Sequence, residues 1–291
     1  MPSIRADDGV RLEYEESGDP AGRPVVLLAG FKAAASSWTY QLPELERAGY
    51  RVLAVDLRGH GAAERPSSGV DMDRRGRDVR DLLEVLDLRG AVLVGGSMGA
   101  STIWSYLGQE GADRVAAVVS VDQTPKMLNT PDWPHGFYGY TEGNVDTYFA
   151  EGIPDTGHGT PMLRRGRRLV RLLRAMKGAE RAFTHGELAL LNDHAQADWR
   201  KVIAATDVPV LFVAGAESEF WPSSHAAASA VLTRRGESAD IARDVKPVVR
   251  KYLGAEVGDA YVDNTRPDGT NEIVIRVRPE RWYWRDSGRT G

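Results

Sequence analysis

Short, uninterrupted apolar runs recur along most of this chain, and they constrain its fold more than any other feature. They occupy residues 25–28, 52–55, 91–94, 115–121 and 210–214. A strand that alternated apolar and polar residues would have one wet face, whereas a continuous apolar run is typical of a parallel strand covered on both faces. Stretches with helical spacing separate the runs, for example Val79, Leu82, Leu83 and Leu86. We therefore predict an α/β fold with a mostly parallel sheet and helices on both faces.

One early segment has a different pattern. Val10, Leu12 and Tyr14 alternate with charged residues after the turn-forming residues 7–9. This alternation predicts a hairpin with one solvated face, which would form an antiparallel edge of the sheet.

Length and composition exclude several classes of function. With 291 residues the chain can form one large α/β domain with an insertion. A net charge of -4 and a pI near 5.9 argue against nucleic acid as the principal partner. The chain has no cysteine, which excludes disulfides, thiolate chemistry and cysteine metal sites.

The same composition bears on location. The first 18 residues contain no apolar signal core, and no apolar run reaches the length of about 18 residues that a membrane span needs. We expect a soluble, cytoplasmic protein with no membrane span.

Ser97 is the strongest candidate for a reacting group. It lies in Gly95-Gly96-Ser97-Met98-Gly99, where an apolar run passes into a stretch with helical character. So tight a strand-to-helix turn needs small residues on both sides of the serine, and it would expose the hydroxyl above the sheet. It would also aim the N–H of Met98, at the positive end of the helix, toward an oxyanion formed at Ser97.

Three motifs occur in order: VVLLAGF at 25–31, VLAVDLRGHG at 52–61 and VLVGGSMG at 92–99. This succession resembles the α/β-hydrolase superfamily, and the resemblance covers about residues 1–232. It implies that the backbone N–H of Phe31 joins that of Met98 in an oxyanion hole, and that His60 has a structural role. Ala29 stands where relatives carry a histidine, which leaves a backbone oxyanion hole intact.

The acid partner departs from the family pattern. The family's aspartate would align with Ser218, within Gly215-Ala216-Glu217-Ser218-Glu219. Some members place the acid at the end of the preceding strand, which here gives Asp122. We expect Asp122 to be the acid, with Glu217 and Glu219 as alternatives. Asp122 could instead serve only to bond the turn at Thr124 and Pro125.

The general base is the main difficulty. The family's histidine follows the final strand, and the last histidine of this chain is His225. Four others lie in the expected insertion: His135, His158, His185 and His194. A packing role for His225 competes with a role as base. We retain it as the candidate base, and we expect weak hydrolysis because an unassisted serine is a poor nucleophile.

The pattern also suggests how the chain is divided. We expect a hydrolase core at 1–123 and 206–235, an inserted cap at 124–205 and an atypical terminal segment at 236–291. In the cap, residues 162–176 predict a helix with an arginine-rich side. That side is either a solvated cationic face or a surface for anionic acyl groups or membranes.

The terminal segment combines an expected helix at 244–253 with strict alternation at 272–278, which predicts a strand. Residues 248–254 and 273–286 resemble the end of split-barrel flavin or deazaflavin proteins of the pyridoxamine-phosphate-oxidase type. The tail is thus either a foreign terminus or a diverged strand and helix that complete the sheet.

Together these features predict a serine hydrolase of small carboxylic esters or similar acyl substrates, with no metal or organic cofactor. Two alternatives stay open. One is a non-hydrolytic protein that binds a small molecule in the same pocket, and the other is a fusion with a fragment of a flavin-binding barrel. The oligomeric state is left open.

Overall fold

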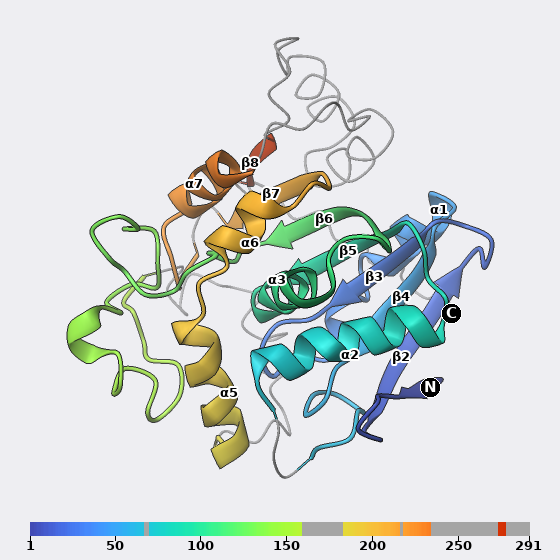
Figure 1. Ribbon diagram of the computed structural model, residues 1–291, viewed down its shortest axis with the longest axis horizontal. Helices are drawn as coiled ribbons and strands as arrows, with labels where there is room; N and C mark the ends of the chain where they lie inside the picture. Colours follow the sequence, from blue (N-terminus) through green and yellow to red (C-terminus); the bar gives the residue numbers. More distant parts are fainter. Residues whose placement is uncertain (67–69, 159–182, 216–217, 234–272, 278–291) are drawn as a thin grey trace, which may run out of the picture.

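One eight-stranded sheet organises the molecule, in the order β1-β2-β4-β3-β5-β6-β7-β8 (Figure 1). The structure is a computed structural model that describes residues 1–66, 70–158, 183–215, 218–233 and 273–277. The strands are β1 (Ser3–Arg5), β2 (Arg11–Gly18), β3 (Pro24–Leu28), β4 (Arg51–Asp56), β5 (Ala91–Gly96), β6 (Val115–Val121), β7 (Val210–Gly215) and β8 (Ile273–Val277).

The strand directions match the sequence pattern. β3 pairs in parallel with β4 and β5, and the parallel ladder continues through β6, β7 and β8. β1 and β2 form the antiparallel edge, and β2 is also antiparallel to β4. The predicted α/β architecture is confirmed, including the edge hairpin and a strand at the predicted position in the terminal segment.

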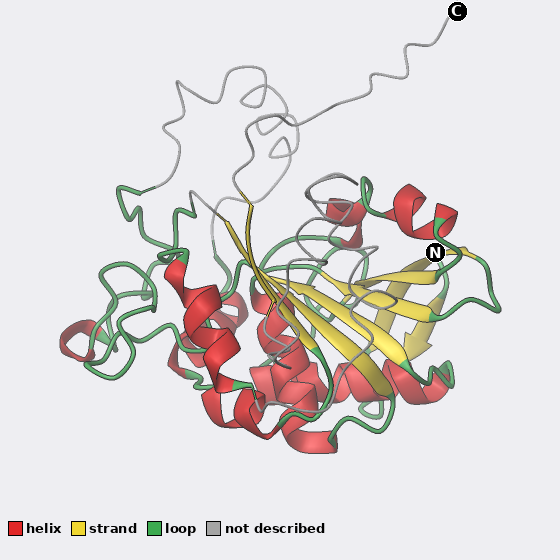
Figure 2. Ribbon diagram, turned by 90° about the horizontal axis from the view of Figure 1, so that it is seen from above, coloured by secondary structure: helices red, strands yellow, loops and turns green. Residues whose placement is uncertain are grey.

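Helices cover both faces of the sheet (Figure 2). They are η1 (Ala35–Trp38), α1 (Leu42–Arg47), α2 (Met72–Val85), α3 (Met98–Glu110), η2 (Glu142–Asn144), α5 (His185–Gln196), α6 (Arg200–Ala205) and α7 (Ser224–Leu232). One core joins the sheet to α2, α3, α6 and α7, and a second core on the opposite face joins it to η1 and α1. Strands β3 to β7 are mostly buried because alternate side chains enter these two cores.

Buried charges fix the loops at the carboxyl end of β4. Asp56 accepts hydrogen bonds from the backbone N–H of Ala35 at 2.6 Å and of Ala62 at 2.9 Å. Arg58 pairs with Asp78 of α2 at 2.6 Å, and both side chains are almost fully buried. Asp56 at the end of this strand and Arg58 after it therefore hold neighbouring loops and α2 in place.

The segment between β6 and β7, residues 122–209, contributes most of a separate, largely aromatic cluster. The cluster consists of Trp221, which follows β7, and of Met127, Phe137, Tyr140, Phe149, Leu191 and Ala195 from the segment. The segment contains η2, α5 and α6 in its described parts. The arginine-rich helix predicted at 162–176 lies outside the described residues.

β8 extends the sheet beside β7, with Ile273 opposite Leu211 and Val277 opposite Gly215. This pairing is the arrangement expected if the terminal segment completes the sheet. The rest of the split-barrel resemblance, at 248–254 and 278–286, falls outside the described residues, as does the expected helix at 244–253. Within the described part of the chain, no helix is both long and apolar enough to cross a membrane.

Candidate active site

Ser97 lies on the turn between β5 and α3, as the motif predicts. Its backbone has φ 49° and ψ -127°, a conformation that costs free energy for a residue with a Cβ. Hydrogen bonds on both sides hold it there: the N–H of Ser97 donates to Val121 at 2.9 Å, and the N–H of Ala100 donates to Ser97 at 2.8 Å. The hydroxyl is thus presented at the end of the sheet by a strained, fixed turn.

The flanking glycines are required by space. A Cβ on Gly95 would lie 2.3 Å from the nitrogen of Ala100, and a Cβ on Gly99 would lie 2.2 Å from the carbonyl oxygen of Leu28. Both contacts are with backbone atoms, which cannot move aside cheaply. The glycines therefore let β3, β5 and α3 approach each other closely enough to form the turn.

Two backbone N–H groups lie near Ser97. A Cβ on Gly30 would be 3.2 Å from the Cβ of Ser97, so the loop that leads into Phe31 passes directly beside the serine. Met98 is the first residue of α3, and its N–H belongs to the first turn, where a helix leaves its donors without an internal partner. Phe31 and Met98 border the same cavity as Ser97.

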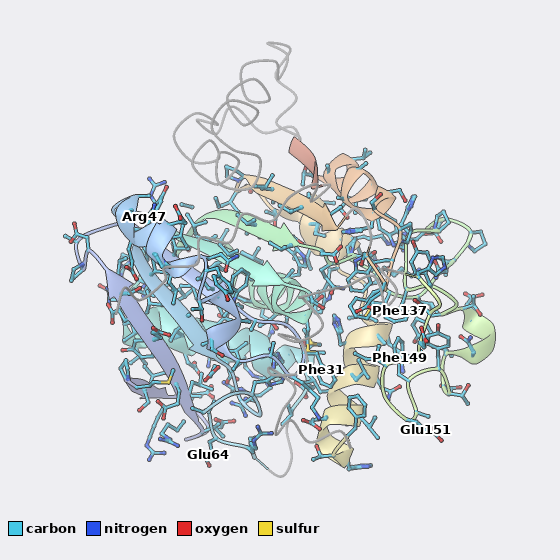
Figure 3. All side chains as sticks on the ribbon, turned by 180° about the vertical axis from the view of Figure 1, so that it is seen from behind. Phe31, Arg47, Glu64, Phe137, Phe149 and Glu151 are labelled. Carbon is cyan, nitrogen blue, oxygen red and sulfur yellow. The ribbon has the colours of Figure 1, made fainter. Side chains whose placement is uncertain are left out.

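That cavity has a volume of about 230 Å³. Its walls are Gly30, Phe31, Ser97, Met98, Met127, Phe137, Phe149, Ile153, Leu191, His194, Phe220 and Trp221. Figure 3 shows Phe31 lying toward Phe137 and Phe149, which come from the β6–β7 segment. Ser97 contributes a hydroxyl and His194 an imidazole to this lining. Apart from the indole N–H of Trp221, the other lining side chains are apolar. The cavity suits a small apolar group.

Asp122 directly follows β6 and adopts a positive φ of 47°. Its carboxylate accepts hydrogen bonds from the N–H of Gly215 at 2.9 Å, the hydroxyl of Ser218 at 3.0 Å and the indole of Trp221 at 3.2 Å. Burial raises the pKa of Asp122, but the neighbouring His225 and these donors outweigh burial and hold the pKa below its ordinary value. Asp122 is therefore an anchored, ionised carboxylate.

The alternative acids, Glu217 and Glu219, belong to the sequence after β7, with Ser218 between them. Ser218, at the position where the family's aspartate aligns, donates to Asp122 and so supports the carboxylate of the preceding strand. Glu219 has a carbonyl that accepts a hydrogen bond from Thr156. Glu217 lies outside the described residues.

His225 is the imidazole beside Asp122. Its Nε2 lies 3.5 Å from Oδ1 of Asp122, and the side chain is only 1% exposed. Neither ring nitrogen has a hydrogen-bond partner among the described residues. His225 does not border the cavity that contains Ser97.

The other histidines of the segment are dispersed. Nδ1 of His135 lies 3.0 Å from the hydroxyl of Ser224, the ring of His158 stacks on Tyr138, and His185 begins α5 on the surface. His194 alone among them borders the cavity. The sequence offers His194 only as one of several histidines that could be recruited as the base. Its spacing of three and four residues from Leu191 and Leu190 places it on the apolar side of α5.

His60 is buried outside the cavity lining, as expected for a structural residue. Its Nδ1 lies 3.0 Å from the carbonyl oxygen of Arg58, and its ring meets Phe31 edge-on. Burial and the charge of Arg75 lower the pKa of His60 to about 3, so the ring is neutral at pH 7. It supports the Phe31 loop by packing.

A family model described as the alpha/beta hydrolase fold matches residues 23–235. The chain belongs to the α/β-hydrolase fold family. A non-heme haloperoxidase of Rhodococcus erythropolis is 31% identical over 245 residues, which cover 79% of this chain and 87% of that protein. A non-heme chloroperoxidase of Streptomyces lividans is 39% identical over 132 residues, 45% of this chain, and the chain spans about half of its length, 48%.

Solved structures of this family are similar over most of the chain. A bromoperoxidase from Bacillus anthracis has a TM-score of 0.67 and 25% identity, with 90% of this chain and 100% of that chain covered. An esterase from Exiguobacterium antarcticum has a TM-score of 0.65 at 21% identity, covering 90% of this chain and 99% of that chain, and shows the shared fold.

Proposed function

We propose that this α/β-hydrolase cleaves small carboxylic esters through Ser97. One observation carries the proposal: the strained Ser97 turn opens into an apolar cavity of about 230 Å³ beside the Phe31 and Met98 backbone. A fixed hydroxyl next to two backbone donors is the arrangement that acyl transfer needs.

In the proposed reaction, Oγ of Ser97 attacks the ester carbonyl carbon and its proton passes to an imidazole. The N–H groups of Phe31 and Met98 stabilise the oxyanion. The bond to the alcohol oxygen then breaks, and the alcohol leaves with the proton. Water attacks the acyl-serine in the same way, releases the acid and restores Ser97.

We assign the imidazole to His225, oriented by Asp122, because the two side chains lie 3.5 Å apart and Asp122 is fixed by hydrogen bonds from Gly215 and Ser218. Among the described residues no imidazole is hydrogen-bonded to Ser97. Proton transfer to His225 therefore requires a bridging water or a shift of α7, which makes the proposed reaction slow.

Turnover of p-nitrophenyl acetate and p-nitrophenyl butyrate by the protein and by its Ser97→Ala variant tests the proposal. We expect release of p-nitrophenol that is lost in the variant, with the melting temperature nearly unchanged because a partly exposed hydroxyl contributes little to packing. Equal turnover by both proteins would assign the activity elsewhere.

A second candidate function is non-hydrolytic binding of a small apolar molecule. It is favoured by the same absence of an imidazole bonded to Ser97 among the described residues, together with the apolar cavity walls. Binding of an ester without any Ser97-dependent turnover would support it.

A further inference from the structure

His194 is a buried imidazole in an otherwise apolar part of the cavity wall. It lies in the last turn of α5, and the side chain borders the cavity with only 4% of the residue exposed. Its Nδ1 is fully buried and has no hydrogen-bond partner among the described residues. A buried polar atom without a partner costs free energy, so its presence calls for an explanation.

The surroundings of His194 favour the neutral ring. Leu191 on the same helix and Phe137, Phe149 and Trp221 on neighbouring elements belong to the apolar cluster that borders the cavity. Burial, together with the positive charge of Arg75, lowers the pKa of His194 to about 3. A neutral imidazole offers one N–H donor and one acceptor nitrogen.

These surroundings also define the group that the ring can accept. A charged group would lose its hydration inside the apolar walls, at a large cost in free energy. A hydroxyl or carbonyl group can bond a neutral imidazole at a much smaller cost. No hydrogen bond joins His194 to Ser97 in the described structure, and both residues border the same cavity.

We propose that His194 binds an uncharged hydroxyl or carbonyl group on the substrate and thereby selects hydroxylated or oxo esters over purely alkyl ones. This inference rests on the proposed ester substrate. It adds a specificity residue on α5 to the site formed by the strand ends.

Binding to the Ser97→Ala variant tests the inference without requiring turnover. The probes are methyl 2- and 3-hydroxybutyrate, each compared with the methyl 2- or 3-methylbutyrate of nearly equal shape, and dissociation constants are measured by tryptophan fluorescence or calorimetry. In Ser97→Ala we expect at least one hydroxy ester to bind more tightly than its methyl counterpart. Adding His194→Leu should shift the ratio of the two dissociation constants by about tenfold, in favour of the methyl ester.

Two further variants sharpen the comparison. His194→Gln keeps a donor and an acceptor and should retain part of the preference. His185→Leu removes an exposed imidazole from the same helix and should leave the ratio unchanged. A ratio that changes less than twofold on His194→Leu for both ester pairs would overturn the inference.

The outcomes separate this inference from the proposed function. A preference that depends on His194 in a protein without Ser97-dependent turnover would support the binding role and refute the hydrolysis. His194→Leu could instead leave the ratio of the two dissociation constants unchanged and lower turnover equally on all esters. That outcome would refute the role of His194 in selection and assign it to proton transfer.

Discussion

At the scale of single residues, Gly99 has the most restricted place in the site. A side chain there would collide with the backbone of β3, because an added Cβ would lie 2.2 Å from the carbonyl oxygen of Leu28. We expect Gly99→Ala to lower the free energy of unfolding by about 3 kcal/mol, in the upper range for overpacking, because backbone must move. Gly186→Ala is the matched control, since Gly186 lies in α5 with no neighbouring atom within 4 Å of an added Cβ. Urea denaturation of both variants measures the difference, and equal stabilities would contradict the account of the turn.

Asp122 gives a prediction about pH. Its pKa is held below the ordinary value in the folded protein, so the ionised carboxylate stabilises the fold at pH values above the unfolded pKa of about 3.9. That contribution is lost as the pH falls through the lower folded pKa. We expect Asp122→Asn to lower the free energy of unfolding by about 1–3 kcal/mol at pH 7. Asparagine also tolerates the positive φ at this position.

The difference between Asp122→Asn and the parent protein should shrink as the pH is lowered from 5 to 3, which denaturation at several pH values measures. A difference independent of pH would contradict an anchored carboxylate.

Esterase turnover should also fall more in Asp122→Asn than in Glu219→Gln, and the reverse order would move the acid to the later loop.

At the scale of elements, α5 carries His194 and is fixed at its first turn. Thr184 accepts a hydrogen bond from the N–H of Glu187 at 3.2 Å, and Glu187 accepts one from the N–H of Thr184 at 2.9 Å. Glu187 also pairs with Lys32 at 3.1 Å, which joins α5 to the loop of Phe31. The helix start thus links the cavity wall to the proposed oxyanion hole.

Thr184→Ala removes this cap. We expect it to lower the free energy of unfolding by about 1 kcal/mol and to raise the KM for butyrate esters, because the cavity wall becomes less ordered. Thr147→Ala, in an exposed turn, is the control and should change neither quantity. Thermal unfolding and steady-state kinetics provide the measurements, and a Thr184→Ala protein that matches the control would show that the cap is unimportant.

Elements also differ in how far the sequence predicts them. The strands were predictable because residues such as Val26 and Leu93 belong to apolar runs whose burial is a local property of the sequence. The Ser97 turn was predictable because so tight a strand-to-helix turn leaves no space for a Cβ on the residues two positions before and after the serine, and both are glycine. The position of His194 at the cavity was not predictable from the sequence. Leu190 and Leu191 mark an apolar side of α5, but they do not indicate which part of the protein that side packs against.

At the scale of the whole molecule, the sheet of the described residues extends through β8, yet no residue from Ala226 to Gly291 is a histidine. The resemblance implies that the base follows the final strand, and this chain has no histidine there. We expect ester hydrolysis slower than that of a complete triad, with about 10³ to 10⁴ times the uncatalysed rate as the lower limit that the oxyanion hole and binding alone supply.

Alanine replacement of His135, His158, His185, His194 and His225, one at a time, identifies any recruited base. The expected result is that His225→Ala lowers turnover on all esters most. Turnover near 10 per second on a simple ester, typical of a complete enzyme, would contradict the impaired site.

Covalent labelling tests the central claim, that Ser97 is a nucleophile, most directly. The protein and its Ser97→Ala variant are treated with a fluorophosphonate, digested and analysed by mass spectrometry. The account predicts a phosphonyl adduct on the peptide that contains Ser97, formed slowly, and no adduct at that position in the variant. Absence of the adduct after prolonged treatment, or equal labelling of the variant at another residue, would contradict it.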